Sequence, residues 1–386
     1  MTIKRYAGDK LVGLSSDTKP TNIPDGATFY ETDTLTPFLL VSGSWSEVGG
    51  GGTALELYAE NPVTPTAPTA TATNSAAIGS GADATGNNSF AIGTNTTASG
   101  GGSLAIGYAA SATTSISQAI GAAASGAGSQ AVEGGATAIG GSYASGTDSF
   151  AAAIADNTSS YGATGANAVA MGYRSKASGS YGFAVGYQNI ASGTYSVALG
   201  RNTTSAGAQG FAAGYLSEAA AVNSTAFGFR SKTRVEGQLA VTSGYFAAAG
   251  DAQSSIYTFR SDTADATAEA LTTDNSTAST DNQIILPNNS AYSFSGTIIA
   301  RQQASAGSNY ASWEIKGALL RDANAASTVL GNGIINKLFA TAGAAAWDID
   351  LTADTTNGGL AITVTGAAAT SIRWVATINT SEVTYA

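Results

Sequence analysis

The segment Asn88-Ser89-Phe90-Ala91-Ile92-Gly93 belongs to a unit that recurs every fourteen residues and decides the fold. Its closing glycine, here named the marker, is found at Gly79, Gly93, Gly107 and Gly121, and again at Gly172, Gly186, Gly200, Gly214 and Gly228. Two positions before the marker each in-register unit has an alanine: Ala77, Ala91, Ala105, Ala119, Ala170, Ala184, Ala198, Ala212, Ala226 and Ala240. A fixed period of this kind predicts a stacked repeat architecture.

A second glycine follows the marker by seven residues in many units, for example at Gly86, Gly100 and Gly179. Two turn-permissive positions per unit predict two short strands joined by two tight turns. Each unit is then one flattened coil, and twelve or so coils spaced by about 4.8 Å predict a parallel β-roll about 60 Å long. The register slips after Gly121, with Glu133, Gly140 and Ala153 as the best matches, which predicts irregular coils or an inserted loop around residues 154–165.

The residues on either side of the repeated alanine are apolar in most units, as with Phe90 and Ile92. They lie on the opposite face of the strand from the alanine, because side chains alternate along a strand. Both faces therefore need cover, and one thin coil buries little by itself. We expect an obligate oligomer, most simply a homotrimer, in which the ten alanines form the close contact between chains.

Two other interpretations of this region are available. Glycine, serine and threonine at this frequency are typical of disordered chains, but disorder does not require alanines in strict phase. A helical solenoid is excluded by the frequent glycines and by the missing 3.6-residue period.

The composition excludes several classes of function. Among 386 residues there are 48 glycines, no histidine and no cysteine, and 11% are charged, where roughly 25% is typical. Without histidine and cysteine the usual zinc, copper and iron ligands and the Ser-His-Asp and Cys-His catalytic groups are missing. We therefore expect no enzyme activity and no cofactor.

The charge and hydropathy patterns exclude further partners. A net charge of −10 provides no basic field for nucleic acid or an anionic membrane. No run of eighteen apolar residues is present, and no apolar run follows Lys4 and Arg5. We expect a chain that is neither exported by a signal sequence nor inserted in a membrane.

Composition divides the chain into four parts, all of them β or extended: a module at 1–60, a Pro/Thr linker at 61–73, the β-roll shaft at 74–248 and a tip at 249–386. In the first part, strands are predicted at 27–32 and 37–41, with Trp45 packed near Phe29 or Tyr30. These three aromatic residues are the candidates for attachment to a larger particle. The alternative is that this module only caps the first coil.

The tip alternates apolar and polar residues in several segments separated by turn signals, which predicts a β-sandwich or jelly roll. The segments are 255–261, 282–287, 291–302, 311–321, 346–351, 360–366 and 371–380. Trp313, Trp347 and Trp374 fall within or beside them and are assigned to the sandwich core.

Two sets of residues are candidates for binding. Asp348, Asp350 and Asp354 offer hard oxygen ligands for Ca²⁺ or paired carboxylates for glycoside hydrolysis, but a solvated strand face explains them better. The position after the marker, together with two arginines beside it, forms a candidate glycan-binding edge of aromatic and guanidinium groups. It consists of Tyr173, Arg174, Tyr187, Arg201, Tyr215, Phe229 and Arg230; the alternative is that these side chains only cover the edge of the ladder.

The repeat, as in Asn88-Ser89-Phe90-Ala91-Ile92-Gly93, resembles the head repeats of trimeric autotransporter adhesins, which form left-handed parallel β-rolls in trimers. Those adhesins also carry a signal peptide and a membrane-anchoring barrel, neither of which is recognised in this sequence, and the same roll occurs in phage fibres. The segment 19–34, followed by Gly43-Ser44-Trp45, is similar to small N-terminal modules of phage tail and head-fibre proteins. The C-terminal part looks like a fibre tip domain.

These resemblances imply a homotrimeric phage fibre located in the virion. Its N-terminal module would bind other virion proteins of the tail or capsid, and its tip would contact a glycan or protein of the host surface. Two alternatives remain: a capsid-anchored head fibre or decoration protein, and a tailspike that degrades polysaccharide.

Overall fold

A computed structural model describes residues 3–6, 8–48, 66–122, 128–156, 158–303 and 308–385. The chain forms two compact units, Met1–Val63 and Thr64–Ala386. Almost all regular structure is β, as predicted; two short 3-10 helices, Ala325–Ser327 and Ala342–Ala344, are the exceptions among the described residues. The glycine run at 49–52 and residues 61–65 of the predicted linker lie outside the described residues.

The first unit is a five-stranded sheet whose strand order follows the chain. Its strands are β1 (Lys4–Tyr6), β2 (Lys10–Gly13), β3 (Thr28–Glu31), β4 (Pro37–Val41) and β5 (Ser44–Glu47). β2 and β3 are parallel, and the other pairs are antiparallel. The two strands expected from sequence are β3 and β4, and the ring of Trp45 packs edge-on against Phe29 with centroids 5.9 Å apart.

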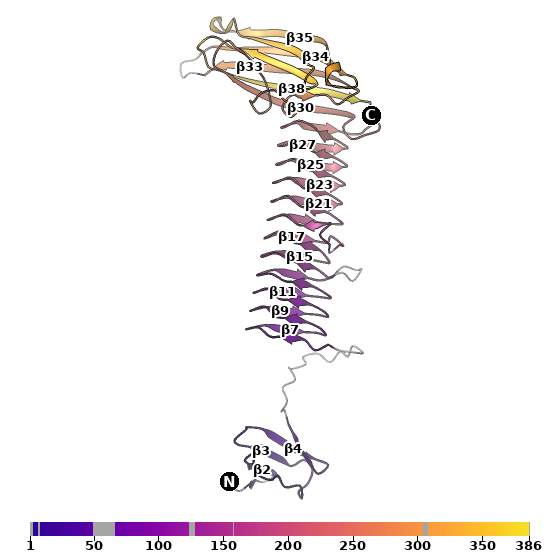
Figure 1. The fold of residues 1–386 in the computed structure, drawn as a ribbon, viewed down its shortest axis with the longest axis vertical. Coiled ribbons are helices and arrows are strands. Elements are labelled where there is room, and N and C mark those ends of the chain that lie inside the picture. Colours follow the sequence, from indigo (N-terminus) through magenta and orange to yellow (C-terminus); the bar gives the residue numbers. More distant parts are fainter. Residues whose placement is uncertain are drawn as a thin grey trace. The chain divides into compact units, whose positions relative to one another are not determined.

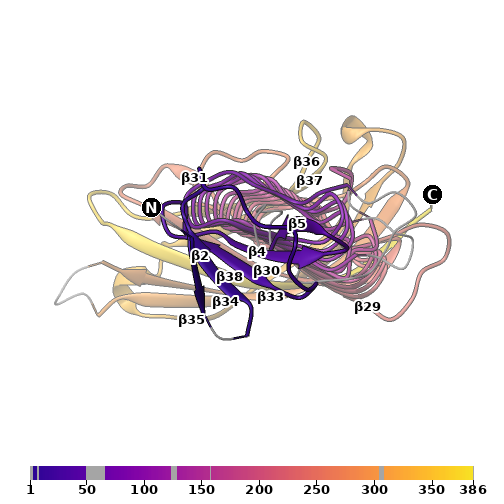
Figure 2. The ribbon, with the colours of Figure 1, turned by 90° about the horizontal axis from the view of Figure 1, so that it is seen from below.

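The shaft is a solenoid in which every coil contributes one strand to each of two parallel sheets (Figure 1). Viewed along the stack, successive coils superimpose (Figure 2). The first sheet, here the marker sheet, consists of β7 (Ala76–Ile78), β9 (Phe90–Ile92), β11 (Leu104–Ile106), β13 (Gln118–Ile120), β15 (Thr137–Ile139), β17 (Phe150–Ala152), β19 (Val169–Met171), β21 (Phe183–Tyr187), β23 (Val197–Arg201), β25 (Phe211–Tyr215), β27 (Thr225–Phe229) and β29 (Leu239–Thr242).

The second sheet, here the short-strand sheet, has twelve two-residue strands. They are β6 (Thr69–Ala70), β8 (Asp83–Ala84), β10 (Thr97–Ala98), β12 (Ser111–Ala112), β14 (Gln130–Ala131), β16 (Tyr143–Ala144), β18 (Gly162–Ala163), β20 (Lys176–Ala177), β22 (Ile190–Ala191), β24 (Thr204–Ser205), β26 (Glu218–Ala219) and β28 (Lys232–Thr233). Because Thr69 already pairs with Asp83, the solenoid begins inside the segment predicted as linker.

The repeated alanines fill the interior of each chain's own solenoid, which corrects their assignment to a contact between chains. From Ala91 to Ala240 the nine alanines are 0% exposed, and Ala77 in the first coil is partly buried. They face a second ladder of small residues from the short-strand sheet, such as Ala84, Ala98 and Ala112. The contact between facing methyl groups makes the coil thin, so the large residues beside each alanine must point outward.

The glycine at the half period also has a different role from the one predicted. The backbone at Gly100 is not left-handed; instead, a Cβ there would lie 1.9 Å from the carbonyl oxygen of Thr114 in the next coil. The marker glycine combines a left-handed backbone with the same close approach. Gly186 has φ +127°, and a Cβ there would lie 2.1 Å from the carbonyl oxygen of Gly200. Stacked backbones therefore exclude any side chain at these corners.

The irregular coils lie where the register slips. Ile120 pairs with Ile139, Ile139 with Ala152 and Ala152 with Met171, so three consecutive coils are nineteen, thirteen and nineteen residues long. Gly140 and Ala153 are marker equivalents, as predicted. Glu133 is not, because it follows the short strand β14. The second long coil extends between β17 and β18, which confirms the inserted loop near residue 154.

The tip is a two-layered sandwich, as predicted. One layer continues the marker sheet in the order β29, β30 (Ala252–Thr263), β38 (Ile372–Thr384), β33 (Ser290–Gln302), β34 (Tyr310–Arg321) and β35 (Val329–Ala340), all antiparallel. The other layer is a small sheet in which β37 (Gly359–Thr365) pairs with β36 (Asp348–Asp354), β31 (Ala268–Ala270) and β32 (Ile284–Ile285). Strands β31 and β35 were not predicted from the sequence.

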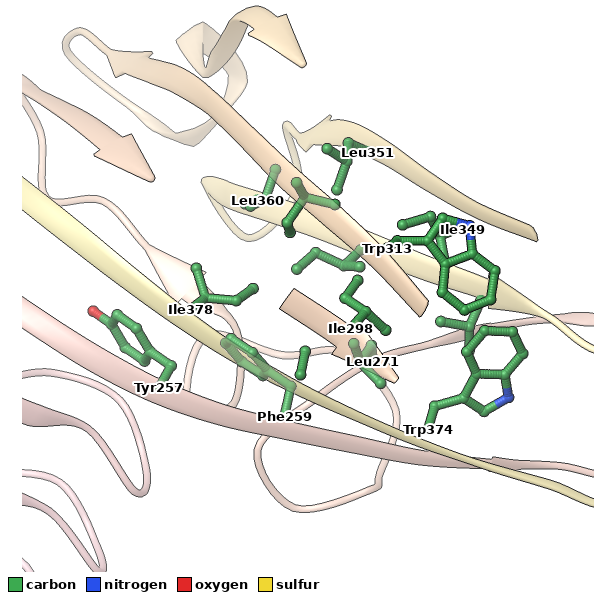
Figure 3. Packing of buried hydrophobic residues seen from close by; sticks show 14 of the residues in the cluster. Tyr257, Phe259, Leu271, Ile298, Trp313, Ile349, Leu351, Leu360, Trp374 and Ile378 are labelled. Carbon is green, nitrogen blue, oxygen red and sulfur yellow. The ribbon is translucent and has the colours of Figure 1, made fainter. Parts of the chain in front are cut away.

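The core of the sandwich lies between these layers (Figure 3). Trp313, Trp347 and Trp374 are at most 1% exposed, which confirms their assignment to the core. The rings of Trp313 and Trp374 stack with centroids 5.4 Å apart. Ile349 and Leu351 of the small sheet complete the packing from the opposite side.

A buried polar network joins the last coil to the tip. The side chain of Glu382 is 0% exposed and lies 3.7 Å from the guanidinium of Arg234 in the last coil. It accepts hydrogen bonds from Gln253 at 2.8 Å, Thr380 at 2.7 Å and Tyr257 at 3.2 Å. Burial, together with the charge of Glu382, raises the pKa of Tyr257 well above its ordinary value, so this phenol remains a donor.

Asp251 holds the loop between shaft and tip. Its carboxylate accepts N–H groups from Phe246, Ala247 and Ala248 at 3.0, 2.6 and 2.7 Å. Burial opposes ionisation, but these donors outweigh it and lower the pKa of Asp251. The shaft and tip are thus connected by strand pairing, by the ion pair of Arg234 with the buried carboxylate of Glu382 and by the hydrogen bonds of Asp251.

We expect Ala198→Leu to destabilise the shaft by about 1–3 kcal/mol or more, because the added carbons have no room between the two facing ladders. Ala220→Leu is the matched control, since Ala220 is exposed on the same stack. Thermal unfolding followed by circular dichroism measures both variants. Equal melting temperatures for the two would contradict the assignment of Ala198 to the coil interior.

We expect Glu382→Ala to lower stability by about 1–3 kcal/mol, because it removes the hydrogen-bond acceptor of the buried donors Gln253 and Tyr257. Glu133→Ala, at an exposed position of the shaft, is the control and should change stability little. Urea unfolding monitored by tryptophan fluorescence reports mainly on the tip, because three of the four tryptophans lie there and only Trp45 lies in the first unit. A transition for Glu382→Ala that matches the control would show that the network does not stabilise the junction.

Candidate functional site

The outward side of the marker sheet is an apolar surface along the shaft, here named the shaft face. Its exposed residues alternate with the buried alanines, and they include Phe90, Ile92, Met171, Phe183, Phe227 and Val241, between 37% and 54% exposed. Large apolar residues repeated along one face of a soluble protein mark an interaction surface. The shaft face, not the alanine ladder, is therefore the surface that a second chain would cover.

The candidate glycan-binding edge forms a continuous column of stacked groups. The rings of Tyr173 and Tyr187 stack at 5.1 Å, and the guanidinium of Arg201 lies between Tyr187 and Tyr215, 5.5 and 5.2 Å from their centroids. Phe229 continues the column at 5.1 Å from Tyr215. The structure thus brings together, in register, residues fourteen positions apart.

The ends of the column are closed by further contacts. Arg174 lies 5.3 Å from the ring centroid of Tyr173 and 5.4 Å from that of Tyr161. At the other end Tyr245 packs edge-on against Phe229, and Arg230 lies 3.8 Å from the centroid of Tyr245. Because the ring faces contact one another and the guanidinium groups, they are not open to a sugar ring. This geometry favours the reading that the column covers and stabilises the edge of the ladder.

A second aromatic pair on the shaft was not predicted from the sequence. Tyr181 and Tyr195 stack with centroids 4.7 Å apart, and they are 50% and 55% exposed. Both residues have left-handed backbone angles, with φ +58°, at the turn opposite the marker. The fourteen residues between them place both tyrosines at the same position of successive coils, and this spacing was the sequence signal for the pair.

The three candidates for attachment in the first unit occupy different environments. Phe29 is 0% exposed and belongs to the core, so it is not a contact residue; this corrects the prediction for Phe29. Tyr30 is 40% exposed. Trp45 is half-buried and donates its indole N–H to the carbonyl of Pro20 at 2.8 Å. Only Tyr30, and in part Trp45, remains available to a partner.

The acidic residues of β36 do not form a cluster. Asp348 and Asp350 are exposed, whereas Asp354 caps the following turn by accepting N–H groups of Thr356 and Asn357 at 2.9 Å. No group of three or more acidic residues placed to hold a metal ion occurs in the described ranges. Among these same residues no helix has the length and apolar character to cross a bilayer.

The fold and its surfaces define a β-solenoid shaft that carries a β-sandwich at one end. Five stretches of the chain match the family model of the YadA head domain repeat: residues 70–96, 163–189, 177–203, 191–217 and 205–231. All five lie within the solenoid, and the coils that they cover match repeats of the adhesin-head type. No curated protein gives a significant match to the chain. The repeats and the solenoid together point to a structural or adhesive role.

If the aromatic column stabilises the ladder, Tyr187→Ala with Tyr215→Ala should lower the melting temperature of the shaft, since each aromatic contact is worth about 0.5–1.5 kcal/mol beyond burial. Tyr108→Ala is the matched control. Tyr108 also follows a marker glycine, but it is 52% exposed, and the equivalent position of the preceding coil is Thr94 rather than an aromatic residue. Thermal unfolding compares the three proteins. If the double variant were as stable as the control but no longer bound on a glycan array, the glycan-binding interpretation would be reinstated.

Proposed function

We propose that this protein is a homotrimeric adhesive fibre of a bacteriophage particle, anchored through its N-terminal module and contacting the host surface with its tip. The observation that carries this proposal is that the exposed apolar shaft face lies on coils that match repeats of the adhesin-head type. A thin coil with apolar residues on its outward side needs cover from other chains, and three identical chains around one axis provide it symmetrically.

Attachment to the virion is supported by the first unit. Residues 19–34 and the segment Gly43-Ser44-Trp45 are similar to modules of phage tail and head fibres. This unit is compact by itself, and it leaves Tyr30 exposed on strand β3. Attachment to the capsid, as in a head fibre or decoration protein, is the alternative within the same class.

Host contact by the tip is supported by its loops, since binding residues concentrate on loops held by a rigid scaffold. Three weak sites per fibre and several fibres per particle would give firm attachment through effective concentration. A polysaccharide-degrading tailspike is the alternative from another class, and release of new reducing ends from host glycan would reveal it.

We expect a chain that begins at Thr66 to remain a folded trimer and to lose its attachment to particles, because it retains every coil but lacks the first unit. Analytical ultracentrifugation gives the oligomeric state, and immunogold labelling of particles gives attachment. The full-length chain is the control. A folded monomer at micromolar concentration would contradict the trimer, and particle labelling by the shortened chain would contradict the anchoring role of the first unit.

A further inference from the structure

The five-stranded layer of the tip has one side packed on the small sheet and one side without a partner in the single chain. The unpartnered side of β30, β33 and β38 is here named the tip face. Its central residues are exposed and uncharged, and its exposed charged residues lie at one end: the uncharged set is Ser254, Ile256, Thr258, Ser293, Ser295, Thr297, Ile299, Val375, Thr377, Asn379, Ser381 and Val383.

The tip face and the shaft face are one continuous surface. Strand β30 pairs with β29 of the last coil, with Leu239 opposite Ile256 and Val241 opposite Ser254. Directly opposite residues point to the same side of a sheet. A shallow hollow of about 320 Å³ spans this junction and is lined by Val241, Ile256 and Asn379, among others. Whatever covers the end of the shaft face therefore meets the tip face as well.

The chemistry of the tip face fits a second copy of the same chain. Four aliphatic residues of the tip face, Ile256, Ile299, Val375 and Val383, are 40%, 47%, 43% and 47% exposed. The charged residues on this side stand at its margins: Arg260, Asp262, Arg301 and Arg373 at one end, and Glu314 and Lys316 on β34. Depletion of charge at the centre with charges at the rim is typical of interfaces between protein chains.

The small side chains at the centre favour packing around an axis. Thr258, Thr377 and Thr297 form one row across three neighbouring strands, and Ser254, Ser381 and Ser293 form another. Short hydroxyl side chains let sheets approach closely and can pair with one another across the contact. Long or charged side chains in these rows would keep three copies apart.

We propose that the tip face packs against the tip faces of the other two copies and continues the interface of the shaft to the distal end of the fibre. The inference rests on the homotrimer of the proposed function. It leaves host contact to other surfaces of the tip, namely the outward side of the small sheet around Asp350 and Thr352 and the edge strand β35. β35 is the strand of its layer farthest from the shaft in the order of pairing.

The absence of cysteine from the natural sequence permits a direct test with single cysteines in the full-length protein. Thr297→Cys reports on the tip face, Ile92→Cys on the shaft face, and Thr352→Cys on the small sheet. Thr297 and Thr352 are both exposed strand threonines in the single chain, so they form a matched pair. The measurement is the rate of modification of the purified protein by a bulky, charged maleimide.

We expect Thr297→Cys and Ile92→Cys to react at least tenfold more slowly than Thr352→Cys. Because only copies of the chain are present, such protection identifies another copy as the cover. Equal rates at Thr297→Cys and Thr352→Cys, with Ile92→Cys protected, would overturn the tip interface while leaving the trimeric shaft in place. A fast Ile92→Cys together with a monomer in sedimentation would overturn the homotrimer itself.

A second pair of variants tests the same surface without labelling. Thr377→Glu places three carboxylates near one another if the tip faces meet, and its cross-strand neighbours Thr258 and Thr297 are uncharged. Thr352→Glu leaves each carboxylate in solvent. We expect a lower melting temperature of the tip for Thr377→Glu alone. The same melting temperature for both variants would contradict a covered tip face.

Discussion

The contact between two facing ladders of alanine determines the rest of this structure. Methyl groups from Ala91, Ala198 and their equivalents meet those of the short-strand sheet, so each coil is a slab only two methyl groups thick. A slab of this thickness has no room for larger side chains, and the apolar residues that a β-sheet needs are displaced to its outside. The exposed shaft face follows from the small size of one repeated residue, and the proposed homotrimer would cover it.

Stacking also creates a problem at the end of the shaft, because the last coil of any solenoid presents unpaired backbone groups. Here the problem is solved by a reversal of strand direction: β29 pairs antiparallel with β30, and the parallel ladder passes into an antiparallel sheet. The ion pair of Arg234 with Glu382 and the clamp of Asp251 fix this transition. The tip is thus a cap as well as a separate sandwich with its own core.

The features that repeat can be predicted from the sequence, because the same residue type recurs at the same position of many units. The coils, the inserted loop near residue 154 and the stacking of Tyr187, Arg201 and Tyr215 all come from spacing alone. The side of the sheet on which a residue lies is harder to predict, since Ala198 and Leu199 are both apolar and only packing shows which is inside. Strand β35 was missed because its two glycines and its exposure on both sides hide the alternation that marks a strand. Phe29 was taken for a contact residue because an aromatic side chain in a small module looks the same in sequence whether buried or exposed.

The stacked column on the shaft shows why an aromatic row does not by itself indicate sugar binding. A sugar ring packs on the face of an aromatic side chain. At a coil spacing of about 4.8 Å, the rings of neighbouring coils stack and cover one another's faces. Only interruptions in such a column would leave a face open, and at Arg201 the interruption is filled by a planar guanidinium that stacks on both sides. An adhesive site on a fibre of this kind is therefore better sought where the period ends, among the loops and strand edges of the tip, because side chains there are free to vary without disturbing the ladder.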